Sequence, residues 1–157
     1  MPDEVLGLPL HPLTVHGAVV LLVVNALAVV VAVLLARFRD WLAWGLPVLG
    51  VASAVTGWGS RLSGGNLYST YEDAGMLTEA VESHGTWGLY AAVASLVLGA
   101  ATVLLYAVHA PPTTQRWPWL GGRASRLGVT VVALGAAAAT LWLTVLAGHS
   151  GATSVWG

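Results

Sequence analysis

The sequence of 157 residues is 57% hydrophobic and only 8% charged, with a formal net charge of −1. Soluble globular domains carry about 25% charged residues, so this composition excludes an ordinary soluble domain and indicates an integral membrane protein. The chain has no cysteine, which excludes disulfides, thiolate metal sites and covalent c-type haem attachment, and its near-zero charge gives no indication of nucleic-acid binding.

Four uncharged, apolar stretches follow one another along the chain, and each is long enough for a membrane-spanning helix. We predict spans at about 13–36, 41–59, 86–108 and 127–147, packed as an all-α four-helix transmembrane bundle in a single integral membrane domain, residues 1–157. The second span is the weakest, because it contains several glycines and Pro47, which can kink a helix. Residues 60–82 read as an interfacial loop that begins with turn residues at 63–66.

The arginines predict how the bundle is oriented. Five of the six follow the first or the third span, whereas the segment after the second span holds one arginine and four acidic residues. Cytoplasmic segments attract arginine, so we expect both termini to lie outside the cytoplasm. The arginines after the first and third spans are Arg37, Arg39, Arg116, Arg123 and Arg126, and the remaining one is Arg61.

Three histidines are expected at the same depth. Measured from the opposite end of its span, each of His16, His84 and His149 lies about 32–38 Å along a helix. The hydrocarbon core is about 30 Å thick, so all three should lie near its extracytoplasmic boundary. They belong to three different spans, and ionisable residues inside membrane bundles are candidates for function. His109 lies at the cytoplasmic end and reads as an ordinary interfacial residue.

Two short segments indicate an internal repeat. "VHGAVVLL" (15–22) and "SHGTWGLY" (83–90) both place His-Gly at the start of an inward-running span. Repeated hairpins would make His16 and His84 near-equivalent, so that they could face each other across the bundle. His11 precedes Pro12, which suits the first turn of a helix, so His11 is expected to cap the helix on a face about 140° away from His16.

Three segments together resemble a bacterial membrane family known as domain of unknown function 2231. They are "LPLHPLTVHGAVVLL" (8–22), "LTEAVESHGTWG" (77–88) and "GHSGATSVW" (148–156), with "SGGNL" (63–67) similar to the family's turn after the second span. The resemblance implies a multi-pass protein of the bacterial cytoplasmic (inner) membrane, and similar proteins joined to Rieske domains suggest electron transfer. The motif residues that it carries over are His11, His16, His84, His149, Gly148, Ser150, Gly151 and Trp156.

The leading functional hypothesis is a membrane electron-transfer protein that binds b-type haem at its extracytoplasmic end. Neutral imidazoles on facing helices can ligate haem iron, and the lack of cysteine favours a bis-histidine arrangement. His16 and His84 are the first predicted pair, and His149 with His11 could form a second site or exchange protons with a quinone. Quinol and a partner redox protein are the expected electron-exchange partners, and the lipid bilayer is the surrounding medium.

Two alternatives stay open. His16, His84 and His149 could instead bind a bare transition metal such as zinc, copper or iron, since imidazole suits all of these. The bundle could also be a structural or assembly protein with no cofactor, because alanine, glycine and valine dominate its spans as expected for close helix packing. The sequence contains neither HExxH nor G-x-S-x-G, so no catalytic residue is assigned and an enzymatic activity is not predicted.

Overall fold

A computed structural model describes residues 4–5 and 7–157 of the chain. Almost all of this length is helical, which confirms the all-α prediction; the exception is a short antiparallel pairing near the N-terminus, in which Glu4 lies opposite Pro9. The elements are β1 (Glu4–Val5), β2 (Leu8–Pro9), α1 (Leu10–Leu34), α2 (Ala36–Leu42), α3 (Gly45–Asp73), α4 (Glu79–Ala107), α5 (Pro111–Arg116), the 3₁₀ turn η1 (Pro118–Gly121) and α6 (Arg123–Trp156).

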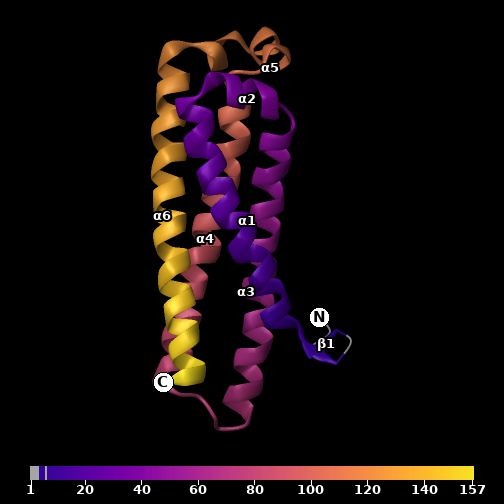
Figure 1. Cartoon of the computed structure of the whole chain (residues 1–157), viewed down its shortest axis with the longest axis vertical. Coiled ribbons are helices and arrows are strands. Elements are labelled where there is room, and N and C mark those ends of the chain that lie inside the picture. Colours follow the sequence, from indigo (N-terminus) through magenta and orange to yellow (C-terminus); the bar gives the residue numbers. More distant parts are fainter. Residues whose placement is uncertain (1–3, 6) are drawn as a thin grey trace.

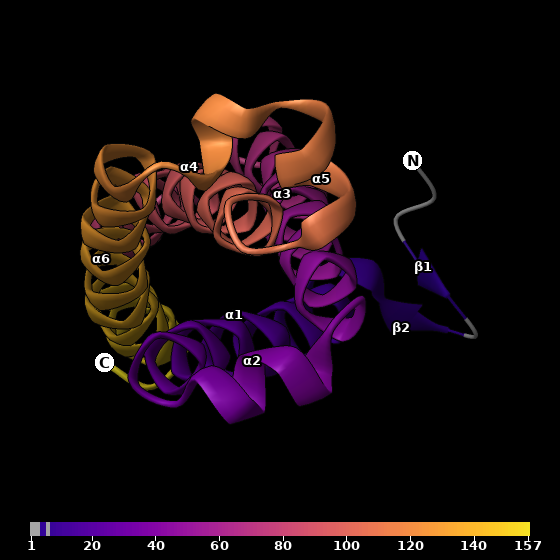
Figure 2. The same ribbon diagram turned by 90° about the horizontal axis from the view of Figure 1, so that it is seen from above.

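The four long helices α1, α3, α4 and α6 run side by side as a bundle (Figure 1). Seen along the bundle, they surround a common axis, with α3 packed between α1 and α4, and α6 packed between α4 and α1 (Figure 2). α1 and α4 therefore lie across a diagonal and touch each other little. Each sequential pair, α1 with α3 and α4 with α6, forms an antiparallel hairpin.

The two ends of the bundle differ in composition. One end, called here the arginine end, carries α2, α5 and η1 together with all of the arginines except Arg61. The other, called here the histidine end, holds the start of α1, the end of α6 and the connection from α3 to α4, Ala74–Thr78. Both ends of the described chain lie toward the histidine end (Figure 1).

Three helices, α1, α4 and α6, are each long and apolar enough to cross a membrane. α2 and α3 pass the same test only as a pair, bent by 77°. Large apolar side chains cover the outside of the bundle, where Val131 is 69% and Trp142 64% exposed, whereas Ala26 and Ala137 inside are fully buried. A water-soluble bundle would bury the larger side chains, so this pattern fits a lipid-facing exterior.

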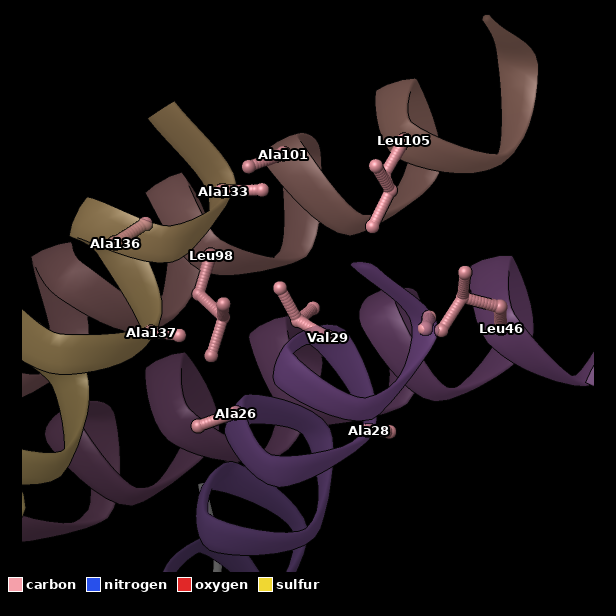
Figure 3. Packing of buried hydrophobic residues seen from close by; sticks show 11 residues of the cluster. Ala26, Ala28, Val29, Leu46, Leu98, Ala101, Leu105, Ala133, Ala136 and Ala137 are labelled. Atoms are coloured by element: carbon pink, nitrogen blue, oxygen red, sulfur yellow. The ribbon is translucent and has the colours of Figure 1, made fainter. Parts of the chain in front are cut away.

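Small residues let the helices approach closely in the centre of the bundle. Figure 3 shows Leu98 and Val29 pointing into a core whose other members are mostly alanines of α1, α4 and α6. α3 and α4 approach each other closely at Gly50 and Gly99, where a Cβ atom on Gly99 would lie only 2.7 Å from the carbonyl oxygen of Gly50. Such contacts are typical of membrane helices, which gain stability from close packing.

The second predicted span differs from the observed helix at both ends. The chain bends between α2 and α3 at Ala43 and Trp44, and Pro47 lies in the first turn of α3, where its missing N–H would have no partner in the helix. α3 then continues to Asp73, so the predicted loop over 60–82 is confined to 74–78 and its predicted turn at 63–66 is wrong. Packing of the glycines against other helices overrides their low helix propensity.

A buried polar network links three helices near the middle of the bundle. Asn25 of α1 is fully buried, and its Nδ2 donates to Ser53 Oγ of α3 at 2.8 Å. Thr102 Oγ1 of α4 lies 3.2 Å from Asn25 Oδ1 and also donates to Leu98 O at 2.7 Å. Ser53 Oγ likewise donates to Gly50 O within its own helix. Both hydroxyl groups therefore keep a backbone partner if Asn25 is removed.

Because the hydroxyl groups of Ser53 and Thr102 keep backbone acceptors without Asn25, we expect the substitution Asn25→Leu to be tolerated. We expect the substitution to lower the free energy of unfolding by only about 1 kcal/mol, in line with measured hydrogen bonds between membrane helices. Thermal unfolding of the detergent-solubilised variant and wild type measures the difference. A loss of several kcal/mol would show instead that the network determines how α1, α3 and α4 associate.

Candidate histidine site

His11 projects from the first turn of α1 across the histidine end of the bundle. Its Nδ1 lies 3.1 Å from Ser63 Oγ of α3, and the Ser63 hydroxyl donates to Ser60 O at 2.9 Å. Because the Ser63 proton is used in that bond, we assign Nδ1–H of His11 as the donor to Ser63 Oγ. This tautomer leaves a lone pair on Nε2. Thr14 Oγ1, 2.8 Å from Ser63 Oγ, completes the cluster.

His84 occupies the equivalent position in the second hairpin. It lies in the second turn of α4, and its Nδ1 is 3.1 Å from the carbonyl oxygen of Ala147 in α6. A carbonyl only accepts, so Nδ1 carries the proton and Nε2 has the lone pair. Ser150 Oγ lies 3.4 Å from the same Nδ1 and donates to Ala147 O.

A glycine makes room for each imidazole. A Cβ atom on Gly64 would lie 2.8 Å from His11 Cε1, and one on Gly151 would lie 2.9 Å from His84 Cε1. Each ring therefore packs against the backbone of the neighbouring helix, at a glycine that directly follows the serine beside its Nδ1. His11 with Ser63-Gly64, and His84 with Ser150-Gly151, are two copies of one arrangement, one in each hairpin.

The two rings meet across the diagonal of the bundle. Their centroids are 6.1 Å apart and their planes are inclined by 64°. Both Nδ1 atoms are held by protein groups, whereas the described part of the chain offers neither Nε2 a hydrogen bond. Histidines that ligate metals are usually held in this way, with the second ring nitrogen donating to a protein oxygen.

The structure places His11, and not the predicted His16, beside His84. His16 is exposed on the side of α1, and its Nδ1 lies 2.6 Å from Pro12 O in the same helix. Residues five positions apart on a helix point about 140° away from each other, so only one of the two can face α4. His11 lies inside α1, which begins at Leu10, so its predicted role as a cap outside the helix is also corrected.

His149 does not join this pair. Its side chain is exposed, whereas the next two residues, Ser150 and Gly151, face His84. The predicted three-histidine metal site (His16, His84 and His149) and the second site (His149 with His11) are therefore not assembled. Across residues 4–5 and 7–157 no group of three or more metal-ligating side chains comes together.

His109 lies at the arginine end, just after α4, as predicted. Its Nδ1 is 2.9 Å from Leu105 O, and the residue is partly buried. Burial lowers the pKa of His109, and the nearby charges of Arg39 and Arg126 lower it further. It is therefore a neutral, packed residue far along the bundle from the histidine pair.

Of the histidine partners, Ser150 and Gly151 are among the predicted motif residues, whereas the partners of His11 are not predicted. Ser63, Gly64 and Arg61 are predicted to lie in a loop, but all three lie within α3. The available signal was the dipeptide Ser-Gly, which occurs at 63–64 and again at 150–151, once near the end of each hairpin's second helix. Comparison of the sequence with family models, with curated proteins and with solved structures found no match.

Proposed function

We propose that this chain is a multi-pass electron-transfer protein of the bacterial inner membrane that binds b-type haem between His11 and His84. In this proposal α1, the bent pair α2–α3, α4 and α6 are the four spans, and the protein is a member of the family that it resembles. The concentration of arginine at one end supports a cytoplasmic location for that end. The histidine end, with both termini, then faces outward.

The observation that carries the proposal is the geometry of the two imidazoles. Bonds from a metal to imidazole nitrogen are about 2.0–2.1 Å, so two imidazoles can share one metal only where their rings lie close together. The His11 and His84 centroids are 6.1 Å apart. Both Nδ1 atoms are anchored and the described chain gives neither Nε2 a hydrogen bond, so His11 and His84 are the residues that would hold haem iron.

Each group at the site has a defined role in this proposal. His11 and His84 would hold the iron, while Ser63 Oγ and the carbonyl of Ala147 fix the tautomer and orientation of the rings. Gly64 and Gly151 allow the rings to lie against α3 and α6. Bound haem supplies reversible one-electron transfer, which suits exchange with quinol in the membrane or with a redox protein outside it.

The surface of the histidine end supports a protein partner. Glu72, Asp73, Glu79 and Glu82 are exposed around the connection from α3 to α4. Complementary charges steer the encounter of redox proteins and raise association rates. We propose a partner with a basic docking surface for this end.

A cofactor-free structural role is the second candidate, and one observation favours it. The Nδ1 bonds of His11 and His84 each join two helices, so the pair also serves as polar contact between membrane helices. A bare metal ion is less well supported, because transition-metal sites in proteins generally use three or four ligands and only two imidazoles meet here.

An absorption spectrum distinguishes these functions. The protein is purified in detergent after expression with haem supplementation, and its spectrum is recorded oxidised and then reduced with dithionite. We expect a Soret band and reduced α and β bands at about one haem per chain, as haem with two histidine ligands gives. Stoichiometric metal by elemental analysis without a Soret band would favour the bare-metal function, and neither signal would favour the structural one.

A further inference from the structure

We propose that Arg61 binds a carboxylate of the ligand held between His11 and His84, which is a propionate group if that ligand is haem. The inference rests on the proposed function and adds a second contact to the same site. It concerns the one arginine that lies away from the arginine end.

Arg61 belongs to the face of α3 that points into the bundle. Gly57, four residues earlier, packs against Ser95 of α4, and Gly64, three residues later, packs against His11 of α1. Residues three and four apart share one face of a helix, so Arg61 lies on the same inward stripe between these two contacts. An ionisable residue on the inner face of a membrane bundle is expensive to keep there without a function.

The guanidinium extends along α3 toward the histidine site. A Cβ atom on Gly65 would lie 3.1 Å from a terminal nitrogen of Arg61, so the glycine leaves the space that the guanidinium occupies. The preceding residue, Gly64, leaves the space for the His11 ring. Gly64 and Gly65 lie at the same level of α3, about 100° apart around the helix, so the guanidinium and the imidazole lie at the same height in the bundle.

The charge of Arg61 is not compensated within the described chain. Its Nε is buried and has no hydrogen-bond partner, and no carboxylate of residues 10–157 forms an ion pair with it. The four acidic side chains of the α3–α4 region are exposed instead. A partly buried guanidinium with a free donor favours an anion, and its planar fork matches a carboxylate.

The inward stripe favours a carboxylate of the ligand over a lipid phosphate. Lipid headgroups reach the outer surface of the bundle, whereas Arg61 lies on the stripe that Gly57 and Gly64 turn toward α4 and α1. Haem carries its two propionates at one edge, so a ligand bound through His11 and His84 brings carboxylates to the region of the site.

Haem and haem dimethyl ester, which lacks free carboxylates, provide the test. Binding of each to the purified, detergent-solubilised apoprotein is titrated by the Soret band for wild type, Arg61→Gln and the control Arg123→Gln, whose residue is exposed at the arginine end. We expect wild type and Arg123→Gln to bind haem about 10- to 100-fold more tightly than the ester, as a charge-assisted hydrogen bond would give. Arg61→Gln should bind both equally.

Each result decides the inference. A wild-type protein that binds haem and its ester equally well overturns the Arg61 assignment without any variant, while the haem function stands. An Arg61→Gln protein that keeps the full preference for haem overturns it as well, and so does one that loses affinity for both ligands while keeping their ratio. If wild type binds neither ligand, the haem function fails, and the assignment fails with it.

Discussion

Replacing either His11 or His84 with alanine should abolish the Soret band of the haem-supplemented protein. The two imidazoles come from different hairpins, and the described part of the chain brings no third metal-ligating side chain to them, so losing one would leave a single imidazole to hold the iron. Removing a group that only orients a ligand costs 10- to 100-fold in affinity, so removing the ligand itself should cost more than about 100-fold. Titration with haem, followed by absorption, measures the loss.

His16 and His149 provide matched controls for this experiment. Both are histidines close in sequence to the site, and both are exposed. His16→Ala and His149→Ala should therefore keep haem binding within about twofold of wild type, as expected for groups that do not touch the ligand. Loss of the Soret band in His16→Ala, with the band retained in His11→Ala, would return the ligand assignment to the pair that the sequence suggested.

The largest effect on stability is expected from Gly99→Ala. The new methyl group would lie 2.7 Å from Gly50 O and 2.8 Å from Ala54 Cβ, and the oxygen belongs to the backbone of α3, which cannot move alone. α3 and α4 must separate to admit it, so we expect a loss of about 2–3 kcal/mol in the free energy of unfolding. The thermal midpoint in detergent should fall accordingly.

Gly135→Ala is the control for this substitution. Gly135 also lies inside a long helix, α6, but a Cβ atom there would meet no atom within 4 Å. The change should be neutral, or stabilising by up to about 1 kcal/mol, because alanine is the better helix former. If the two variants unfold at the same temperature, the close approach of α3 and α4 at Gly50 and Gly99 is not needed for stability.

The apolar runs of the sequence predict the all-α fold class because a long uncharged segment in a bilayer is restricted to a helix. An uncharged stretch such as 13–36 can satisfy its backbone in a bilayer only as a helix, and α1 lies where that stretch was found. The end of α3 could not be predicted in the same way. Ser63 and Gly64 have turn propensities when considered locally, and in α3 both contact His11, about fifty positions earlier in the chain.

The sequence predicts the depth of the histidines in the bundle, but not which of them point inward. Depth alone, counted at 1.5 Å per residue, placed His16 and His84 at one level, but depth does not determine which side of a helix faces inward. That direction depends on the packing of α1, which turns His11 toward α4 and leaves His16 on the outside. Arg61 was read as a loop residue for a related reason, since its inward direction follows from the helical path of α3.

The position of His11 and His84 on diagonal helices has a consequence for folding. α1 and α4 share few direct contacts, so a ligand bound by both imidazoles would add a connection between the two hairpins. A ligand that binds only the assembled bundle stabilises it by an amount that grows with the logarithm of its free concentration, about 2.7 kcal/mol at one hundred times the dissociation constant. Occupancy of the site would thus add to the packing of α3 on α4 and of α6 on α1, which already joins the two halves of the chain.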